Sequence, residues 1–337
     1  MIKVGIIGAG SFAAQHAQAI ASVNGVSIVS ASRRNTTALA EFTSRFGGRG
    51  YADYQDLLKD NEVDAVVIAT PHHTHTSVVE AAARAGKHIL LEKPMAPNLA
   101  ECDRIVQCTK ETGVKLMLGH TGHFIPAVQS AKKLLESGEM GEVVYGVATK
   151  SKKWMNPDRR EWHLDRAYGG GMWMTIGVHA LDQLTWLIGA PVEHVSAQMQ
   201  TRFHNQQADD TGVAFLRYAN GATGTAVSIG FQTGVFTFVT ELTCTKGMLR
   251  IDNSRGAFIG RDEQWQLVPG STGENWMAAA LVNEWQAFVN ALEQDTETAV
   301  TAEFGRHIMA VAFAAEESST LRKEVTVNSK RNTFYEQ

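Results

Sequence analysis

The chain begins with a glycine-rich motif that strongly limits how it can fold. Residues 8–13 read Gly-Ala-Gly-Ser-Phe-Ala, the pattern G-x-G-x-x-A, directly after the apolar run Ile2–Ile7. Between a strand and a helix, Gly8 permits a tight turn, Gly10 lets the backbone approach a pyrophosphate, and Ala13 allows close packing of helix on sheet. The motif therefore predicts a dinucleotide-binding loop at the start of a helix, where free N–H groups favour anions.

The rest of the chain divides into two patterns. Up to residue 120, apolar runs alternate with segments of helical spacing, which predicts a parallel sheet. Beyond Gly119, strand-like stretches with glycine turns dominate until a long helix over 302–321, which indicates a mainly antiparallel sheet. We predict an α/β protein: a Rossmann domain with a doubly wound parallel sheet over 1–120, and an α+β domain with a large, mainly antiparallel open sheet over 121–337 for substrate binding and oligomerisation.

Composition excludes several classes of function. The net charge of −4 gives no basic surplus for nucleic acid or an anionic membrane. Three cysteines are few and odd in number, which favours a reducing compartment. The uncharged stretch Tyr218–Thr240 alternates apolar and small residues, so it reads as two strands and not as a membrane helix. We expect a soluble cytoplasmic protein that acts on a small molecule.

The end of the second predicted strand indicates which dinucleotide binds. NAD sites usually place Asp or Glu there, to bind the ribose hydroxyls. This chain has Ser30-Ala31-Ser32-Arg33-Arg34, without a carboxylate. Ser32 can hydrogen-bond a 2′-phosphate, and Arg33 or Arg34 can pair with it. The pattern predicts NADP(H), with a solvated basic loop as the alternative.

Three segments together resemble the Gfo/Idh/MocA oxidoreductases. They are KVGIIGAGSFA at 3–13, ATPHHTHTSVVEAAARAGKHILLEKPMA at 69–96, and GGGMWMTIGVHALD at 169–182. The last helix and the strand after it are also similar, so the resemblance covers essentially the whole chain. It implies NAD(P)-dependent hydride transfer, with a catalytic lysine at Lys93 and an acid/base histidine at His179. The cofactor-binding positions that it implies, beside the second-strand residues above, are Gly8, Gly10, Ser11, Phe12, Thr70, Pro71, His75, Glu92 and Lys93.

Physical reasoning supports the two catalytic roles. Lys93 follows a predicted parallel strand, so it lies at the sheet edge where ligands bind, and its ammonium can stabilise a developing alkoxide. Pro94 fixes the turn after it, and a cis peptide bond there is an open alternative. Helical spacing over 175–187 places Thr175, His179 and Asp182 on one face. His179 can then exchange a proton with substrate while Asp182 orients its ring.

The sequence departs from the family pattern near the substrate. Many members carry Asp where this chain has Thr175, and Arg where it has His123. A hydroxyl at Thr175 binds substrate but cannot act as a carboxylate base, so the substrate contacts are expected to differ. Trp154 and Trp162 lie in the polar segment KSKKWMNPDRREWHLD and are candidates for a pocket wall. Its cations could attract an anionic substrate, although a solvated loop is the simpler interpretation.

Several histidines invite a metal hypothesis, which we do not adopt. They fall on loops at the predicted sheet edge, where they can line an active site; they are His72, His73, His75, His120 and His123. We predict no metal, and an NADP-dependent enzyme that interconverts a secondary alcohol and a ketone on a sugar or sugar-like polyol. The alternatives are a cyclic dihydrodiol dehydrogenase and a non-catalytic NADP-sensing regulator. Alternating apolar residues over 223–238 further predict a homodimer or homotetramer associated through the second sheet.

Overall fold

The computed structural model describes residues 1–155, 159, 161–166, 170–273 and 275–328. The chain forms two compact units. The first contains Met1–Thr121 and Met277–Arg306, and the second contains Gly122–Trp276 and the residues from His307 onward. A division at residue 120 was predicted, but the return of 277–306 to the first unit was not.

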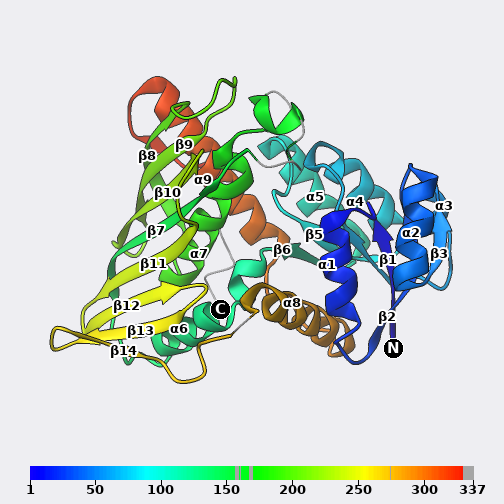
Figure 1. The fold of residues 1–337 in the computed structure, drawn as a ribbon, viewed down its shortest axis with the longest axis horizontal. Coiled ribbons are helices and arrows are strands. Elements are labelled where there is room, and N and C mark those ends of the chain that lie inside the picture. The colour runs from blue at the N-terminus through cyan, green and yellow to red at the C-terminus, as the bar shows by residue number, and fades with distance from the viewer. Residues whose placement is uncertain (156–158, 160, 167–169, 274, 329–337) are drawn as a thin grey trace. The chain divides into compact units, whose positions relative to one another are not determined.

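The first unit is built on a six-stranded parallel sheet in the order β3-β2-β1-β4-β5-β6. Helices α1, α2, α4 and α5 connect its strands (Figure 1). The strand order reverses between β1 and β4, which is the place where such sheets bind dinucleotides. The strands are β1 Ile2–Ile7, β2 Val26–Ser32, β3 Arg49–Tyr51, β4 Ala65–Ile68, β5 His88–Glu92 and β6 Leu116–Gly119. The helices are α1 Ser11–Ile20, α2 Thr36–Phe46, α3 Tyr54–Leu58, α4 His75–Arg84 and α5 Leu99–Thr112, with the 3₁₀ turns η1 His72–Thr74 and η2 Thr121–Phe124.

A helix from late in the chain, α8 (Trp276–Glu293), completes the first unit and was missed by the sequence analysis. Its apolar residues recur at helical spacing, as in Leu281, Trp285 and Phe288. Trp285 is fully buried and bonds to a side chain of α1, and Figure 1 shows α8 beside α1. This packing is the physical reason why the segment belongs with the first unit.

The second unit is a nine-stranded sheet in the order β14-β13-β12-β11-β7-β10-β9-β8-β15. All neighbouring pairs are antiparallel except β7 and β10. The fold class is therefore confirmed. The strands are β7 Val143–Lys153, β8 Val192–Gln200, β9 Thr211–Tyr218, β10 Thr223–Phe231, β11 Thr237–Cys244, β12 Gly247–Asp252, β13 Gly256–Arg261, β14 Gln264–Leu267 and β15 Val325–Thr326.

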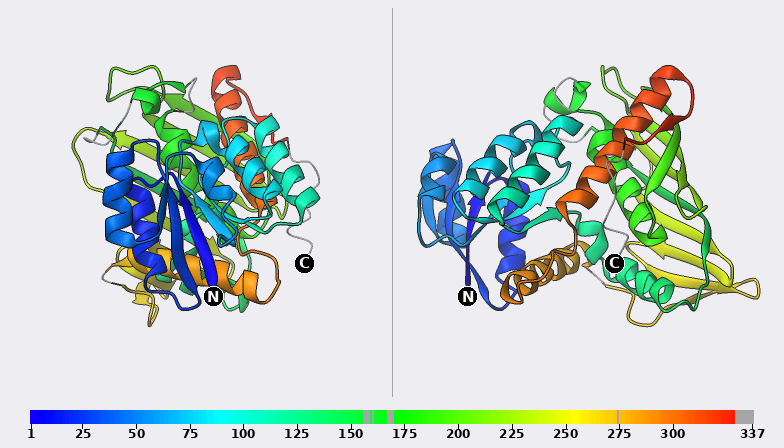
Figure 2. Two further views of the ribbon diagram at one scale, coloured as in Figure 1. Left: turned by 90° about the vertical axis from the view of Figure 1, so that its right-hand side faces the viewer. Right: turned by 180° about the vertical axis from the view of Figure 1, so that it is seen from behind.

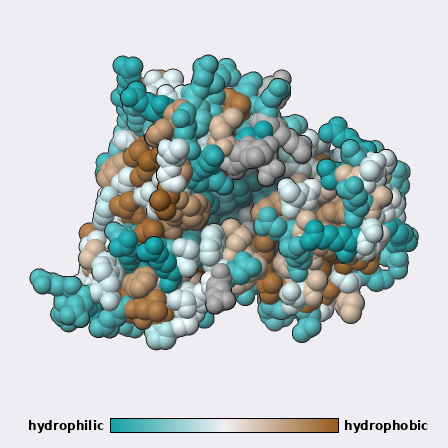
Figure 3. Space-filling view, in the orientation of Figure 1, coloured by the Kyte–Doolittle hydropathy of each residue, from teal (hydrophilic) through white to brown (hydrophobic). Residues whose placement is uncertain are grey.

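One face of this sheet carries helices and the other does not, as the views of Figure 2 show. The helices are α6 Pro126–Glu136, α7 Val178–Ile188 and α9 Ala302–Leu321. Along β9, buried Ala214 and Leu216 alternate with Val213 and Phe215, which are 39% and 41% exposed. Figure 3 shows apolar residues scattered among polar ones over this sheet. The alternation follows from the two-residue period of a strand, which sends successive side chains to opposite faces.

The uncharged stretch over 218–240 forms β10 with parts of the strands beside it, as predicted. Within the described residues, the search for helices long and apolar enough to cross a membrane finds none.

Candidate active site

The glycine-rich loop joins β1 to α1 at the carboxyl edge of the parallel sheet. Gly8 has φ +91°, and a Cβ there would lie 2.8 Å from the carbonyl oxygen of Ala69, so only glycine fits without strain. A Cβ at Gly10 would meet nothing closer than 3.8 Å. Gly10 begins α1 without a side-chain cap and without an acidic residue in the first turn, which Ser11 and Phe12 open. Uncapped N–H groups beside open space fit the pyrophosphate of a dinucleotide.

The end of β2 is bonded to this loop. The backbone N–H groups of Gly8 and Ala9 both donate to the Ser32 carbonyl, at 3.1 Å each. Arg33 Nη1 donates to the Ala9 carbonyl at 3.0 Å, while Arg34 is exposed. Ser32 is only 3% exposed. The arginines, more than the Ser32 hydroxyl, are therefore the accessible donors at this position.

His75 holds together the loops that follow β4 and β5. Its Nε2 is 2.9 Å from the carbonyl oxygen of Thr70, and its Nδ1 is 3.1 Å from that of Pro94. Burial lowers the pKa of His75. The side chain is 1% exposed. His75 was predicted to bind the cofactor; its contacts with the Thr70 and Pro94 carbonyls connect the two loops that contain Pro71 and Lys93.

Lys93 is the accessible residue of its segment. In 91–96, all of them described, every residue except Lys93 is buried. The Lys93–Pro94 peptide bond is cis, the alternative that the sequence left open. The ammonium group thus reaches the surface at the carboxyl end of β5, where the parallel-sheet rule places ligands.

A buried chain of hydrogen bonds, missed by the sequence analysis, lies next to Lys93. Trp285 Nε1 donates to His16 Nδ1 at 3.0 Å, so that nitrogen is an acceptor and the ring hydrogen is on Nε2. His16 Nε2 therefore donates to Glu92 Oε1, 2.9 Å away. Glu92, predicted to bind the cofactor, is 7% exposed and is held by His16. No sequence spacing connects His16 with Trp285, which is 269 residues later.

In the second unit, a π-helical turn, η5 (Trp173–Gly177), leads directly into α7. From 171 to 185, all described, only Thr175 and His179 are not buried. Thr175 and His179 are one turn apart in a segment whose other side chains are packed. The two residues predicted to act on substrate are therefore the two that are not fully buried in this segment, although the Thr175 hydroxyl oxygen itself is buried.

The turn before η5 depends on Gly171 and Asp209. Asp209 Oδ2 accepts the N–H of Trp173 at 2.7 Å. Gly171 has φ +107°, and a Cβ there would come within 2.3 Å of Asp209 Oδ1. Burial raises the pKa of Asp209 to about 7, with further help from the charge of Glu316. This packing explains part of the triglycine; its first member, Gly169, lies outside the described residues.

Asp182 and His123 form a buried pair. Asp182 Oδ1 is 2.7 Å from His123 Nε2, and the His123 ring stacks on Trp186 with centroids 4.3 Å apart. Asp182 was expected to orient His179, and His123 to contact substrate. One carboxylate oxygen of Asp182 holds His123, and His123 is 3% exposed.

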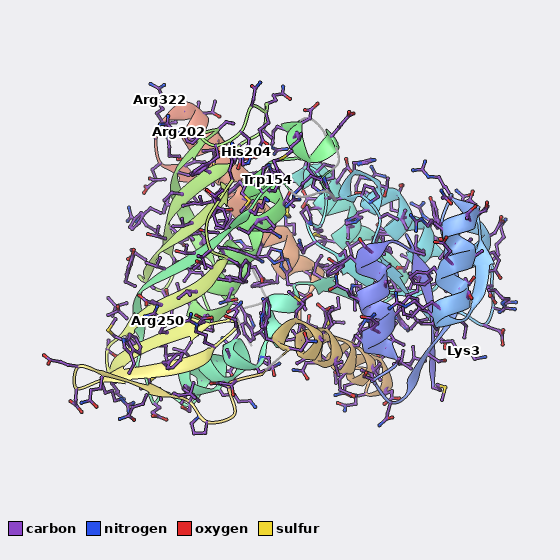
Figure 4. The ribbon with its side chains drawn as sticks, in the orientation of Figure 1. Lys3, Trp154, Arg202, His204, Arg250 and Arg322 are labelled. Atoms are coloured by element: carbon purple, nitrogen blue, oxygen red, sulfur yellow. The ribbon has the colours of Figure 1, made fainter. Side chains whose placement is uncertain are left out.

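Trp154 does not form an exposed pocket wall. Its side chain, labelled in Figure 4, is fully buried. It clusters with Met172 and Ile176 and donates from Nε1 to Gln206 Oε1 at 2.8 Å. The prediction is wrong because the tryptophan follows β7 into the core of the second unit. Trp162 lies in the 3₁₀ turn η3 (Glu161–Leu164), and its side chain is outside the described residues.

The histidines do not gather into a metal centre in the part of the chain that the structure describes, where no group of three or more potential ligands occurs. His72 and His120 are buried, and His73 is exposed. His75 and His123 have the contacts given above.

Comparison with known proteins identifies the family. The model described as "Oxidoreductase family, NAD-binding Rossmann fold" of GFO_IDH_MocA matches residues 2–120, and the GFO/IDH/MocA C-terminal domain matches 128–250. The chain belongs to the Gfo/Idh/MocA family. It is therefore an NAD(P)-dependent oxidoreductase, as the resemblance implied, and the family's NAD-binding domain coincides with the glycine-rich loop and sheet edge described above.

Individual relatives of this Gfo/Idh/MocA protein span most of its length. A myo-inositol 2-dehydrogenase of Thermotoga maritima is 26% identical over 96% of this chain and 98% of its own. A 1-carboxy-3-chloro-3,4-dihydroxycyclohexa-1,5-diene dehydrogenase of Comamonas testosteroni is 28% identical over 68% of this chain and 58% of its own. The solved structure of the WlbA dehydrogenase from Bordetella pertussis, with NADH and UDP-GlcNAcA, has a TM-score of 0.84 at 26% identity and covers 98% of each chain.

Proposed function

We propose that this oxidoreductase uses NADP(H) to interconvert a secondary alcohol and a ketone on a sugar-like polyol. The observation that carries the proposal is that Lys93, and Thr175 with His179, are only partly buried in segments that are otherwise buried. Similarity to the inositol dehydrogenase supports a polyhydroxylated ring as substrate.

A nicotinamide cofactor, when bound, would supply or accept the hydride. The ammonium of Lys93 hydrogen-bonds the reacting oxygen and stabilises negative charge that develops on it. In the oxidation direction, the alcohol carbon loses hydride while His179 takes the hydroxyl proton; in reduction His179 returns it. Thr175, one turn from His179, positions the substrate through a hydrogen bond, because a hydroxyl cannot serve as a base near neutral pH.

Substitution of the two proposed catalytic residues tests this mechanism. Lys93→Ala and His179→Ala should each lower kcat by about 10²–10⁴-fold while leaving the dissociation constant for NADPH nearly unchanged. Thr175→Ala is the matched variant and should cost less. Near-normal kcat in His179→Ala would contradict the assignment. Cofactor binding without turnover of sugars, inositols or dihydrodiols by the unmodified protein would favour an NADP-sensing regulator.

The preference for NADP(H) rests on the end of β2. Its residues Ser30–Arg34 include no carboxylate to repel a 2′-phosphate, and Arg33 and Arg34 offer guanidinium donors. Fluorescence titration should show tighter binding of NADPH than NADH. Arg34→Ala should remove about tenfold of that preference, the worth of one charge-assisted contact, whereas Arg45→Ala should not. Equal affinities in the unmodified protein would refute the preference.

A cyclic dihydrodiol is the second candidate substrate. Similarity to the Comamonas dehydrogenase, whose name specifies a dihydroxycyclohexadiene, favours it. Both candidates place two hydroxyl-bearing carbons on a ring. Assays with an inositol and with a benzene dihydrodiol, compared by kcat/KM, distinguish them.

The open face of the second sheet supports a homodimer or homotetramer. Its alternating apolar residues, such as Phe215 on β9 and Val227 on β10, form a surface that a second copy can cover. Light scattering should give a dimer or tetramer, and Phe215→Asp should shift it toward monomer. A monomeric unmodified protein at micromolar concentration would contradict the expectation.

A further inference from the structure

Strand β7 directs two lysines to the helix-covered face of the second sheet. Lys150 is 7% exposed and lies in register with Ser228 on β10 and Phe238 on β11. Lys152, two residues further, points to the same face because side chains alternate along a strand. Helix α7 packs on β7 and β10 on this face. The lysines therefore share a face of the sheet with the helix that carries His179.

Arg159 follows β7 in the sequence and contacts Trp154, the residue after the end of the strand. Its Nε donates to the Trp154 carbonyl at 2.8 Å, and its guanidinium lies 3.8 Å from the centroid of the Trp154 ring. The Lys150 ammonium lies 4.3 Å from the centroid of the Phe238 ring. The carbonyl and ring partners of Arg159 orient its guanidinium without neutralising the charge.

The positive charges of Lys152 and Arg159 act against each other. Burial lowers the pKa of Lys152, and the charge of Arg159 lowers it further. Burial also lowers the pKa of Arg159 to about 10. Among the described residues, no ion pair joins either side chain to a carboxylate. Two like charges held partly out of water are unfavourable until an anion joins them.

A solvated loop does not account for this arrangement. In such a loop, long cationic side chains stay in water and move apart, as Lys153 does on the opposite face, where it is exposed. Lys152 and Arg159 are instead partly buried. Lys152 is in register with Gly230, where a Cβ would lie 2.8 Å from the Cβ of Trp154, and Arg159 lies over the Trp154 ring, so both cations are near Trp154. The simpler sequence interpretation is thus replaced for these two residues.

We propose that Lys152 and Arg159 bind a carboxylate or phosphoryl group carried by the substrate. This inference rests on the proposed dehydrogenase function and names a substrate class within it. The planar guanidinium of Arg159 can make two parallel hydrogen bonds to either group, and Lys152 adds charge. A neutral polyol brings no negative charge to Lys152 and Arg159, so the site selects against it.

Matched substrate pairs test the proposal. With NADP⁺ present, kcat/KM is measured for glucuronate against glucose, for glucose 6-phosphate against glucose, and for a carboxylated cyclohexadiene diol against the same diol without the carboxylate. We expect the anionic member of at least one pair to be preferred by tenfold or more. The pair with the larger ratio identifies carboxylate or phosphoryl as the group that is bound. Equal use of both members in every pair overturns the proposal.

Variants locate the preference on the protein. Lys152→Met and Arg159→Met should each raise KM for the preferred anionic substrate about tenfold, with kcat nearly unchanged. Lys153→Met, on the same strand but the other face, is the control and should leave KM within twofold. An effect of Lys153→Met equal to that of Lys152→Met would overturn the assignment.

Calorimetry separates this proposal from the proposed function. The same anionic probes are titrated into the NADP⁺-bound protein, whether or not turnover occurs. Binding that weakens in Lys152→Met, without turnover of any probe, supports the anion site and counts against the proposed dehydrogenase substrates. The absence of binding by every anionic probe overturns the anion site even if neutral polyols are oxidised.

Discussion

The buried polar groups of the two units differ in whether each one has a partner of complementary charge or hydrogen-bonding type. In the first unit, Trp285, His16 and Glu92 form a continuous chain in which each hydrogen-bond donor faces an acceptor. In the second, Lys152 and Arg159 are partly buried beside each other, with only neutral partners described for Arg159. A satisfied polar chain stabilises a scaffold, whereas uncompensated like charge favours a ligand of opposite sign. The comparison separates polar groups that serve the fold from those that serve binding.

The largest expected effect is on the scaffold side. Glu92→Ala should lower the free energy of unfolding by about 3 kcal/mol, because the buried His16 Nε2–H loses its acceptor. Glu62→Ala, which removes an exposed carboxylate paired with Lys3, should cost at most about 1 kcal/mol. Urea unfolding measures both. Similar small costs for the two variants would show that the buried chain does not stabilise the first unit.

The free energy of unfolding should depend on pH because Asp209, in the second unit, binds a proton more tightly in the folded state. Its pKa is about 7 in the folded protein and near 3.8 when unfolded. The folded state therefore binds the proton more tightly, and its contribution to stability is lost as pH rises through 7. From pH 5 to pH 7 the free energy of unfolding should fall by about 2 kcal/mol from this group. Asp209→Asn should flatten that slope; an unchanged slope would contradict the assignment.

A smaller effect is expected from the far end of the His16 chain. Trp285→Phe keeps an aromatic ring but removes the N–H that donates to His16 Nδ1, and should cost about 1 kcal/mol. Trp265→Phe, at a residue 42% exposed, is the matched control and should be nearly neutral. Thermal and urea unfolding of both variants provide the measurement. Equal free energies of unfolding for the two variants would show that the Trp285 N–H does not stabilise the first unit.

The smallest effect should have the opposite sign. Lys152→Met keeps the aliphatic stem and removes the repulsion from Arg159, so the protein should be unchanged or more stable by less than about 1 kcal/mol. Lys153→Met should change stability by a few tenths at most, about what surface substitutions do. Destabilisation by Lys152→Met of more than about 1 kcal/mol would show that the cation is structural, and the contrast between the units would no longer hold.

The sequence by itself determined the parts of this protein that depend on local patterns. The glycine motif identified the loop after β1. The buried strand that ends at Glu92 placed Lys93 at the edge of the sheet. Helical spacing placed Thr175 and His179 one turn apart, and neither residue is fully buried. Positions of this kind follow from sequence because a turn, a strand end or a helix face is set by residues a few positions apart.

The tertiary structure alone decided which side chains meet across long separations. It paired Asp182 with His123, buried Trp154 under Gln206, and brought Trp285 of α8 to His16 of α1. It also showed that Lys152 and Arg159, for which a solvated loop was the simpler interpretation, are partly buried. Local spacing holds no information on such contacts, because they depend on how sheets and helices pack and on which polar groups that packing encloses.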